Sequence, residues 1–181
     1  MSAFDAFLAA RGLKTLQLRI KAQSESAFRI ACFLNEHPSV TRVWYPGLLH
    51  HRGHEIAKKQ MSGGFGGILS FEVQGNPQNA TKVVESTRLF HTAVSVGAVE
   101  SIIEQPAFMS HASYDRKDRV AHGLSDGLIR ISVGLEDTED LIRDLYQALS
   151  QAGKTKPSTP EPVKKLPLSP PSSLPKAVAF G

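Results

Sequence analysis

Prolines are concentrated at one end of the chain, and this confines where a fold can form. Seven of the eleven prolines lie in residues 153–181, which read GKTKPSTPEPVKKLPLSPPSSLPKAVAFG. Proline has no backbone N–H to donate and disrupts both helices and sheet ladders. The segment also has few large apolar residues to offset the entropy of ordering it. We therefore predict a disordered, partly polyproline-II tail at 153–181 and a folded unit within residues 1–152.

The net charge of +4 belongs to this tail rather than to the folded unit. Residues 153–181 hold five lysines and one acid, whereas residues 1–152 hold equal numbers of basic and acidic residues. A neutral body lacks the basic surface that binds a phosphate backbone, so we expect no nucleic-acid partner. For the tail, we favour a solvated segment over a ligand for a proline-reading domain.

The sequence also lacks signals for membranes and secretion. No apolar run approaches the roughly 20 residues that span a bilayer, and the N-terminus has no basic stretch followed by an apolar core. The single cysteine, Cys32, excludes an internal disulfide framework, and we expect it to be a buried structural residue. We therefore expect a cytoplasmic protein without a membrane partner.

The body alternates between helical and strand-like patterns. Residues 14–37 contain neither Gly nor Pro, and their apolar residues recur at helical spacing up to Pro38, so we expect a long amphipathic helix. The further elements expected are strands at 40–44, 68–73 and 128–133, and helices at 54–61, within 76–90 and after Asp137. Strands separated by helices predict a small α/β or α+β layer structure.

An arginine inside an apolar strand is the most informative side chain. Arg130 lies in the sequence LIRISV, where a charge is costly unless it is paired or faces solvent on the polar side of an alternating strand. The pattern does not separate these two interpretations. An arginine on a rigid strand is suited to bind a carboxylate through two parallel hydrogen bonds. Ser95, which precedes Gly97 in AVSVGAVES, could donate to the same anion.

Two other motifs are weaker candidates for a functional site. His50, His51 and His54 could suggest a metal ion, but Gly53 interrupts their helical spacing and no cluster of Cys or acidic residues completes a site, so no metal is expected. The SGGFGG segment at 62–67 lacks the Lys-Ser/Thr ending of a phosphate-binding loop. We expect it to form a tight turn beside a strand.

Five segments in a fixed order connect the chain to a known family. They are RGLKTLQLR at 11–19, HPSVTRVWYPGL at 37–48, SGGFGGILSFEV at 62–73, SVGAVESIIEQPAFMSH at 95–111 and GLIRISVGLEDTEDLIRDLYQAL at 127–149. Together they closely resemble the C-terminal part of the Cys/Met-metabolism family of pyridoxal-phosphate (PLP) enzymes. That family includes cystathionine γ-synthase, cystathionine β- and γ-lyases, methionine γ-lyase and homoserine sulfhydrylases. The resemblance runs over residues 2–152 and singles out no one member.

The resemblance implies a fold-type I PLP-dependent transferase, in which a large domain carries the cofactor and a small C-terminal domain closes over the substrate. Residues 1–152 would be that small domain with its long N-terminal connecting helix. Arg130 matches the arginine that pairs with the α-carboxylate of the amino-acid substrate. Ser95 matches the serine of an SLGG-like motif, here SVGA, that helps to hold the same carboxylate. Val94 stands where several γ-acting members have an acid, which leans weakly towards a lyase.

The resemblance also implies chemistry that this sequence does not supply. The family requires a lysine that forms an aldimine with PLP, and no lysine of residues 1–152 matches a cofactor motif. We therefore assign no catalytic or cofactor-binding residue and expect no turnover by this chain alone. The intact relative would eliminate or replace a β- or γ-substituent of a sulfur amino acid, with lyase and synthase both open.

Several arrangements of such a chain stay open. It could be a fragment of a longer gene or a degenerate paralogue, a subunit that assembles with a separately encoded large domain, or a non-catalytic module that docks onto an intact paralogue. In each case the connecting helix would expose an apolar side that faces a large domain in the family. Such a patch favours association, including homo-oligomers.

Overall fold

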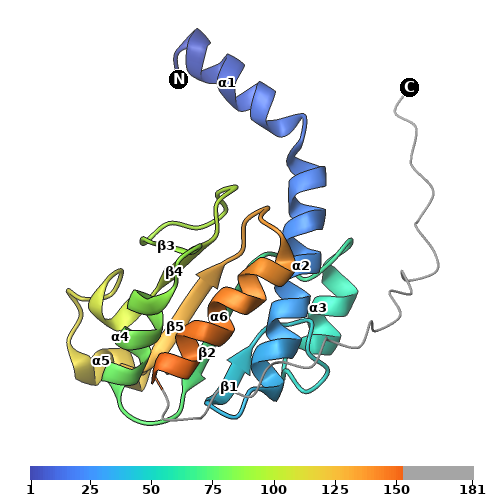
Figure 1. Cartoon of the computed structure of the whole chain (residues 1–181). Coiled ribbons are helices and arrows are strands. Elements are labelled where there is room, and N and C mark those ends of the chain that lie inside the picture. The colour runs from blue at the N-terminus through green and yellow to red at the C-terminus, as the bar shows by residue number, and fades with distance from the viewer. Residues whose placement is uncertain (153–181) are drawn as a thin grey trace.

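The computed structural model describes residues 1–152, so the predicted tail at 153–181 lies outside the described residues. Most elements follow the order expected from the sequence (Figure 1). The elements are α1 (Ala3–Leu13), α2 (Leu16–Glu36), β1 (Val40–Trp44), α3 (His54–Gln60), β2 (Ile68–Val73), α4 (Pro77–Ser86), β3 (His91–Thr92), β4 (Ile102–Glu104), the 3-10 turn η1 (Pro106–Phe108), α5 (Arg116–Ala121), β5 (Leu128–Ser132) and α6 (Thr138–Ala152).

Each helix and strand expected from the sequence is present. Hydrogen bonds from side chains to the backbone explain where α4 ends and where α6 begins. The α4 helix fills only Pro77–Ser86 of the 76–90 window. It stops because the Asp144 carboxylate accepts hydrogen bonds from the backbone N–H groups of Arg88 and Leu89, which turns the chain away. Asp137 caps α6 as expected, and its Oδ1 accepts from the N–H of Asp140 at 3.1 Å.

The sequence did not predict α1. Its N-terminus is a capping box, in which the Ser2 hydroxyl accepts from the Asp5 N–H while the Asp5 carboxylate accepts from the Ser2 N–H. The helix continues through Gly12, where an added Cβ would meet no atom within 4 Å. Local capping thus starts a helix that has no buried residue of its own. Also unforeseen were the short elements β3, β4, η1 and α5.

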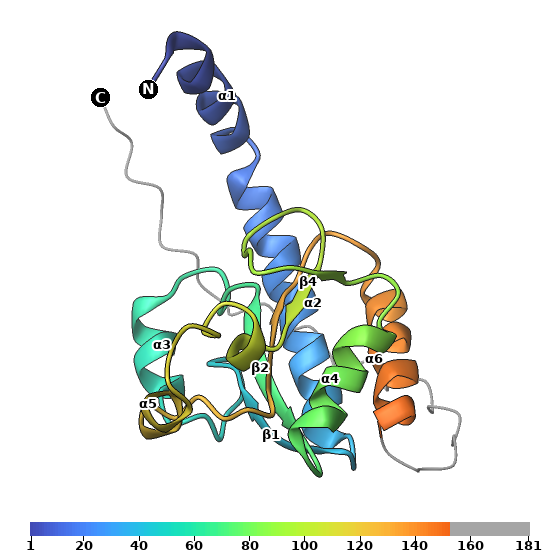
Figure 2. The ribbon, with the colours of Figure 1, turned by 90° about the vertical axis from the view of Figure 1, so that its left-hand side faces the viewer.

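The strands form one mixed sheet in the order β1-β2-β5-β4-β3, in which only the β3–β4 pair is parallel. This confirms the expected combination of helices with a sheet. Helices α2, α4 and α6 pack together against one face of the sheet. Figure 2 shows α4 and α6 on that side and α3 and α5 on the other. The two faces of the sheet therefore have different surroundings.

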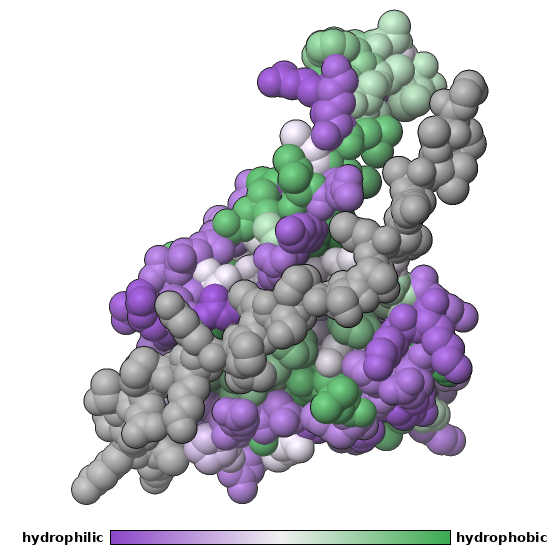
Figure 3. Space-filling model, turned by 90° about the vertical axis from the view of Figure 1, so that its right-hand side faces the viewer, coloured by the Kyte–Doolittle hydropathy of each residue, from purple (hydrophilic) through white to green (hydrophobic). Residues whose placement is uncertain are grey.

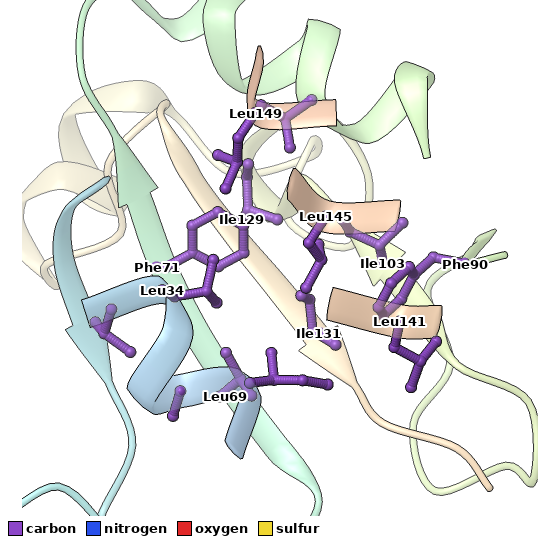
Figure 4. Close-up of a cluster of buried hydrophobic side chains, with 14 of the residues drawn as sticks. Leu34, Leu69, Phe71, Phe90, Ile103, Ile129, Ile131, Leu141, Leu145 and Leu149 are labelled. Carbon is purple, nitrogen blue, oxygen red and sulfur yellow. The ribbon is translucent and has the colours of Figure 1, made fainter. Parts of the chain in front are cut away.

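Alternation along the strands sends apolar side chains to the helical side. Phe71 of β2 and Ile129 and Ile131 of β5 are fully buried there against Leu145 of α6 (Figure 4). Burying each such side chain contributes about 1.5–3 kcal/mol. The other face of the same strands carries Ser70, Glu72, Arg130 and Ser132, together with Glu104 of β4. This polar face is where a site can form.

The first turns of the molecule expose apolar side chains. Along α1 and the start of α2, Phe4, Phe7, Leu13 and Leu18 each leave more than three fifths of their surface exposed, between 62% and 70%. Figure 3 shows apolar residues gathered over this end of the molecule. Leu18 lies on α2, the expected connecting helix, whereas Phe4, Phe7 and Leu13 lie on α1, which the sequence did not predict. An exposed apolar face of this kind favours association. Within residues 1–152, no helix combines the length and the hydropathy needed to cross a membrane.

Candidate functional site

Arg130 occupies the polar face of β5, between the buried residues Ile129 and Ile131 of the opposite face. Of the two interpretations that the sequence left open, the structure combines parts of both. The side chain points away from the helical core, yet only 25% of it is exposed and it is paired. Its Nη2 lies 2.7 Å from Oε1 of Glu104. The strand backbone fixes the Cα of Arg130 on both sides through the ladders to β2 and β4.

Glu104 is a site residue that sequence reasoning missed. It lies directly opposite Arg130 in the antiparallel β4–β5 ladder and is 0% exposed. Its Oε1 also accepts a hydrogen bond from the Ser110 hydroxyl at 3.0 Å. Its Oε2 is buried without a hydrogen-bond partner among residues 1–152. The available signal was an acid directly after two apolar residues in SIIEQ, but using it required knowing that β4 neighbours β5.

The loop that carries Ser95 lies beside Arg130. The Arg130 Nη2 donates a long hydrogen bond, 3.4 Å, to the carbonyl oxygen of Val94, the residue before Ser95. Ser95 itself is exposed, and its hydroxyl makes no hydrogen bond to any residue that the structure describes. The structure thus brings the two predicted site residues into one neighbourhood. It leaves the Ser95 hydroxyl available to a ligand.

Two buried side chains tether this loop, and neither was predicted from the sequence. The Ser132 hydroxyl accepts from the N–H of Gly97 at 2.9 Å. Gln23 of α2, 3% exposed, donates to the carbonyl of Ala98 at 2.7 Å. Gly97 has a φ of +79°, a left-handed conformation that glycine adopts without strain. The loop is therefore held at two successive residues, Gly97 and Ala98.

His51 and His54 serve local structure, whereas His50 is exposed. His54 is 7% exposed, its Nδ1 lies 2.8 Å from the carbonyl of Pro46, and its ring packs on Phe65. His51 Nδ1 accepts from the Gly53 N–H at 3.1 Å, and partial burial, followed by the charge of Arg52, lowers the pKa of His51. In the described part of the chain, no three His, Cys, Asp or Glu side chains group as a metal site would require.

The SGGFGG segment is a turn that packs on α2, as expected of a structural loop. A Cβ at Gly64, whose φ is +132°, would lie 2.8 Å from the Cβ of Ser24. The Tyr45 hydroxyl donates to the Gly66 carbonyl at 2.9 Å. Cys32 differs from expectation, because it is only partly buried at the edge of the core. Burial, with a smaller effect of the Glu36 charge, raises the pKa of its thiol.

The described residues do not form a cofactor pocket by themselves. An aldimine-forming lysine must be desolvated or placed beside another cation to become nucleophilic. All six lysines of residues 1–152 are exposed. They are Lys14, Lys21, Lys58, Lys59, Lys82 and Lys117. These residues therefore do not fit PLP, and no chemical step through the cofactor is assigned to them.

Comparison with known proteins gives the site its context. The family of Cys/Met metabolism PLP-dependent enzymes matches residues 1–150. The chain belongs to this family. The cofactor of Cys/Met metabolism PLP-dependent enzymes is pyridoxal phosphate, and their curated members that resemble this chain act in sulfur amino-acid metabolism.

Individual relatives in the Cys/Met-metabolism family agree closely. A cystathionine gamma-lyase of Dictyostelium discoideum is 50% identical over 150 residues, 83% of this chain and 38% of the relative. A cystathionine beta-lyase of Lactococcus lactis subsp. cremoris is 51% identical over 148 residues, which are 81% of this chain and 38% of the relative. The crystal structure of cystathionine gamma synthase from Xanthomonas oryzae pv. oryzae in complex with cystathionine superposes with a TM-score of 0.79. It has 46% identity over 83% of this chain and 39% of that one. The chain thus spans less than two fifths of the length of these relatives.

Proposed function

We propose that residues 1–152 are the C-terminal, substrate-carboxylate-binding domain of a PLP-dependent enzyme that acts on sulfur-containing amino acids, with α2 as its connecting helix. The observation that carries the proposal is the position of Arg130. It is a partly exposed guanidinium, fixed by a central strand and adjacent to the loop of Ser95. Membership of the Cys/Met-metabolism family supplies the amino-acid substrate class.

The geometry supports binding of a carboxylate in three ways. The two described contacts of Arg130 both use Nη2, so its Nη1 and Nε donors have no hydrogen-bond partner among residues 1–152 and can bind a ligand. A carboxylate held by two guanidinium donors has a defined plane as well as a defined position. The Ser95 hydroxyl can add a third hydrogen bond. Anchoring the carboxylate in this way orients the substrate's α-carbon, which is a positioning role.

Binding of L-cystathionine to the purified chain, measured by calorimetry, tests this proposal. We expect Arg130→Gln to weaken binding by about 10- to 100-fold, because a hydrogen bond to a charged group contributes about 1.5–3 kcal/mol. Ser95→Ala removes a neutral donor and is expected to weaken binding by about 2- to 10-fold. Arg29→Gln, which removes a surface partner of Glu139 on α6, is the matched control. Equal affinity of the wild type and the Arg130 variant, both folded by circular dichroism, would overturn the proposal.

A second candidate function rests on the apolar face of α1 and α2. Four large side chains there are mostly exposed, which favours association. We propose as the alternative a non-catalytic module or subunit that pairs through this face with a separate large domain or an intact paralogue. Co-expression with an intact paralogue tests it. Retention of the chain on the tagged paralogue, abolished by Phe7→Glu and Leu18→Glu together, supports this role, and a chain that never co-purifies refutes it.

A further inference from the structure

A buried acid faces the proposed carboxylate site. Glu104 is fully buried, and its described interactions are the ion pair with Arg130 and one hydroxyl, that of Ser110. Its second oxygen has no partner within residues 1–152. Removing a carboxylate from water is costly, and this network compensates only in part. Glu104 therefore contributes little to the stability of the fold, and its main effect falls on Arg130.

We propose that Glu104 is a counter-charge that lowers the affinity of Arg130 for a carboxylate ligand. The inference rests on the proposed function, because it assigns Glu104 a role in the same site. Glu104 acts through Arg130 and is a positioning residue rather than a catalytic one. The register of the β4–β5 ladder holds the two residues opposite each other. The negative charge therefore stays beside the guanidinium whether or not a ligand is bound.

Two effects of Glu104 oppose each other, and their sizes decide the outcome. Its carboxylate orders the guanidinium, which favours binding of a ligand. Its charge neutralises the guanidinium and repels an incoming carboxylate, which disfavours binding. The interaction of two charges a few ångströms apart corresponds to a change in affinity of about 5-fold in water and about 1000-fold near a protein surface. Because a quarter of the Arg130 side chain is exposed, solvent screens this effect towards the lower end, about tenfold.

A variant that keeps the hydrogen bond retains most of the ordering of the guanidinium. Glu104→Gln retains a side-chain oxygen that can accept from Arg130 Nη2 while removing the charge. The substitution therefore separates the two effects, and we expect it to tighten carboxylate binding by about tenfold. Glu104→Met removes the charge and the acceptor at similar volume. It is expected to bind more tightly than the wild type but less tightly than Glu104→Gln.

The test is an NMR titration of the full chain with butyrate, followed through the Arg130 Nε–Hε signal. That signal is identified by its loss in Arg130→Gln and reports directly on the guanidinium. If Glu104 had a purely structural role, the affinity measured through this signal would not change in the Glu104 variants. Butyramide is the ligand control, and Glu139→Gln on α6 is the matched charge control. We expect the affinity for butyrate to rise in both Glu104 variants and to stay unchanged in Glu139→Gln. Butyramide should leave the signal in place in every protein.

The possible failures are distinguishable. If butyrate binds to the wild type and to both folded Glu104 variants with equal affinity, or binds the variants more weakly, the counter-charge is refuted while the carboxylate site stands. If butyrate moves the Arg130 signal in none of the proteins, the site itself is refuted and the inference falls with it. If only one Glu104 variant folds, its affinity alone gives the same decision.

Discussion

Replacing Asp144 provides the sharpest test of how the sheet edge near the site is held. The carboxylate, 5% exposed, accepts from the Arg88 N–H with both oxygens at 2.9 Å and from the Leu89 N–H at 2.7 Å. A hydrogen bond to a charged group contributes about 1.5–3 kcal/mol. Arg88 and Leu89 are themselves exposed, so water replaces part of what Asp144→Ala removes. We therefore expect a loss of about 2–3 kcal/mol in the free energy of unfolding.

Urea unfolding followed by circular dichroism measures this loss. Asp144→Asn keeps one acceptor oxygen and is expected to lose about half as much, about 1–1.5 kcal/mol. Asp140→Ala on the same helix is the matched control. Its carboxylate is exposed and, among residues 1–152, pairs only with Arg143 at the surface, a contact that contributes at most about 1 kcal/mol. If Asp144→Ala were no more destabilising than Asp140→Ala, the hydrogen bonds from Arg88 and Leu89 to Asp144 would not stabilise the fold.

The remaining predictions concern packing, titration and the cofactor. Gly64→Ala is expected to lower the free energy of unfolding by about 1–3 kcal/mol, because Gly64 has a left-handed backbone and an added Cβ would meet α2. Gly12→Ala, at a helical position with space for a Cβ, should raise the free energy of unfolding by about 0.5–1 kcal/mol. Thermal unfolding compares the two variants, and an equal change in stability would contradict the packing of the loop on α2. Burial raises the pKa of Tyr45. The stability that its neutral phenol provides is therefore complete below the ordinary tyrosine pKa and is lost as pH rises through the pKa of Tyr45 in the folded protein. Ultraviolet titration of the wild type and Tyr45→Phe should show that this phenol ionises only on unfolding, and its ionisation in the ordinary pH range would disprove this. Borohydride trapping with PLP followed by peptide mapping should give no specific adduct on the lysines of residues 1–152, and one stoichiometric adduct displaced by an amino acid would show a cofactor site that we do not assign.

Regular patterns made much of the fold predictable. The stripe of Leu141, Leu145 and Leu149 at helical spacing gave α6, and all three are fully buried. Alternation in LIRIS gave β5 and drew attention to Arg130 as the charge that breaks an apolar strand. These signals are local, since period and side-chain type alone decide them. The family resemblance, confirmed by comparison, added the family and its cofactor, which no local pattern contains.

The unpredicted part of the site depends on the order of the strands. Glu104 meets Arg130 because β4 lies beside β5 in the sheet. The order of strands in the sheet, in which β5 lies between β2 and β4, differs from their order along the chain. The β4 strand has only three residues, too few for alternation to define it. Gln23 likewise reaches the loop of residues 94–98 from a helix 75 residues away in sequence. Sequence patterns named both predicted members of the site and missed the residues that hold them.

The hydrogen bonds that join the loop of residues 94–98 to Ser132 and Gln23 determine whether the loop is ordered before a ligand binds. A loop that becomes ordered only when ligand binds subtracts its ordering entropy from the affinity. Here the Gly97 N–H is bonded to Ser132 and the Ala98 carbonyl to Gln23, so the loop beside Arg130 is ordered by the fold itself. Ser132 lies two residues beyond Arg130 on the same face of the same strand, so one rigid element sets both the loop and the guanidinium. The proposed carboxylate site is therefore preformed, and we expect its affinity to depend on charge, through Arg130 and Glu104, more than on conformational change.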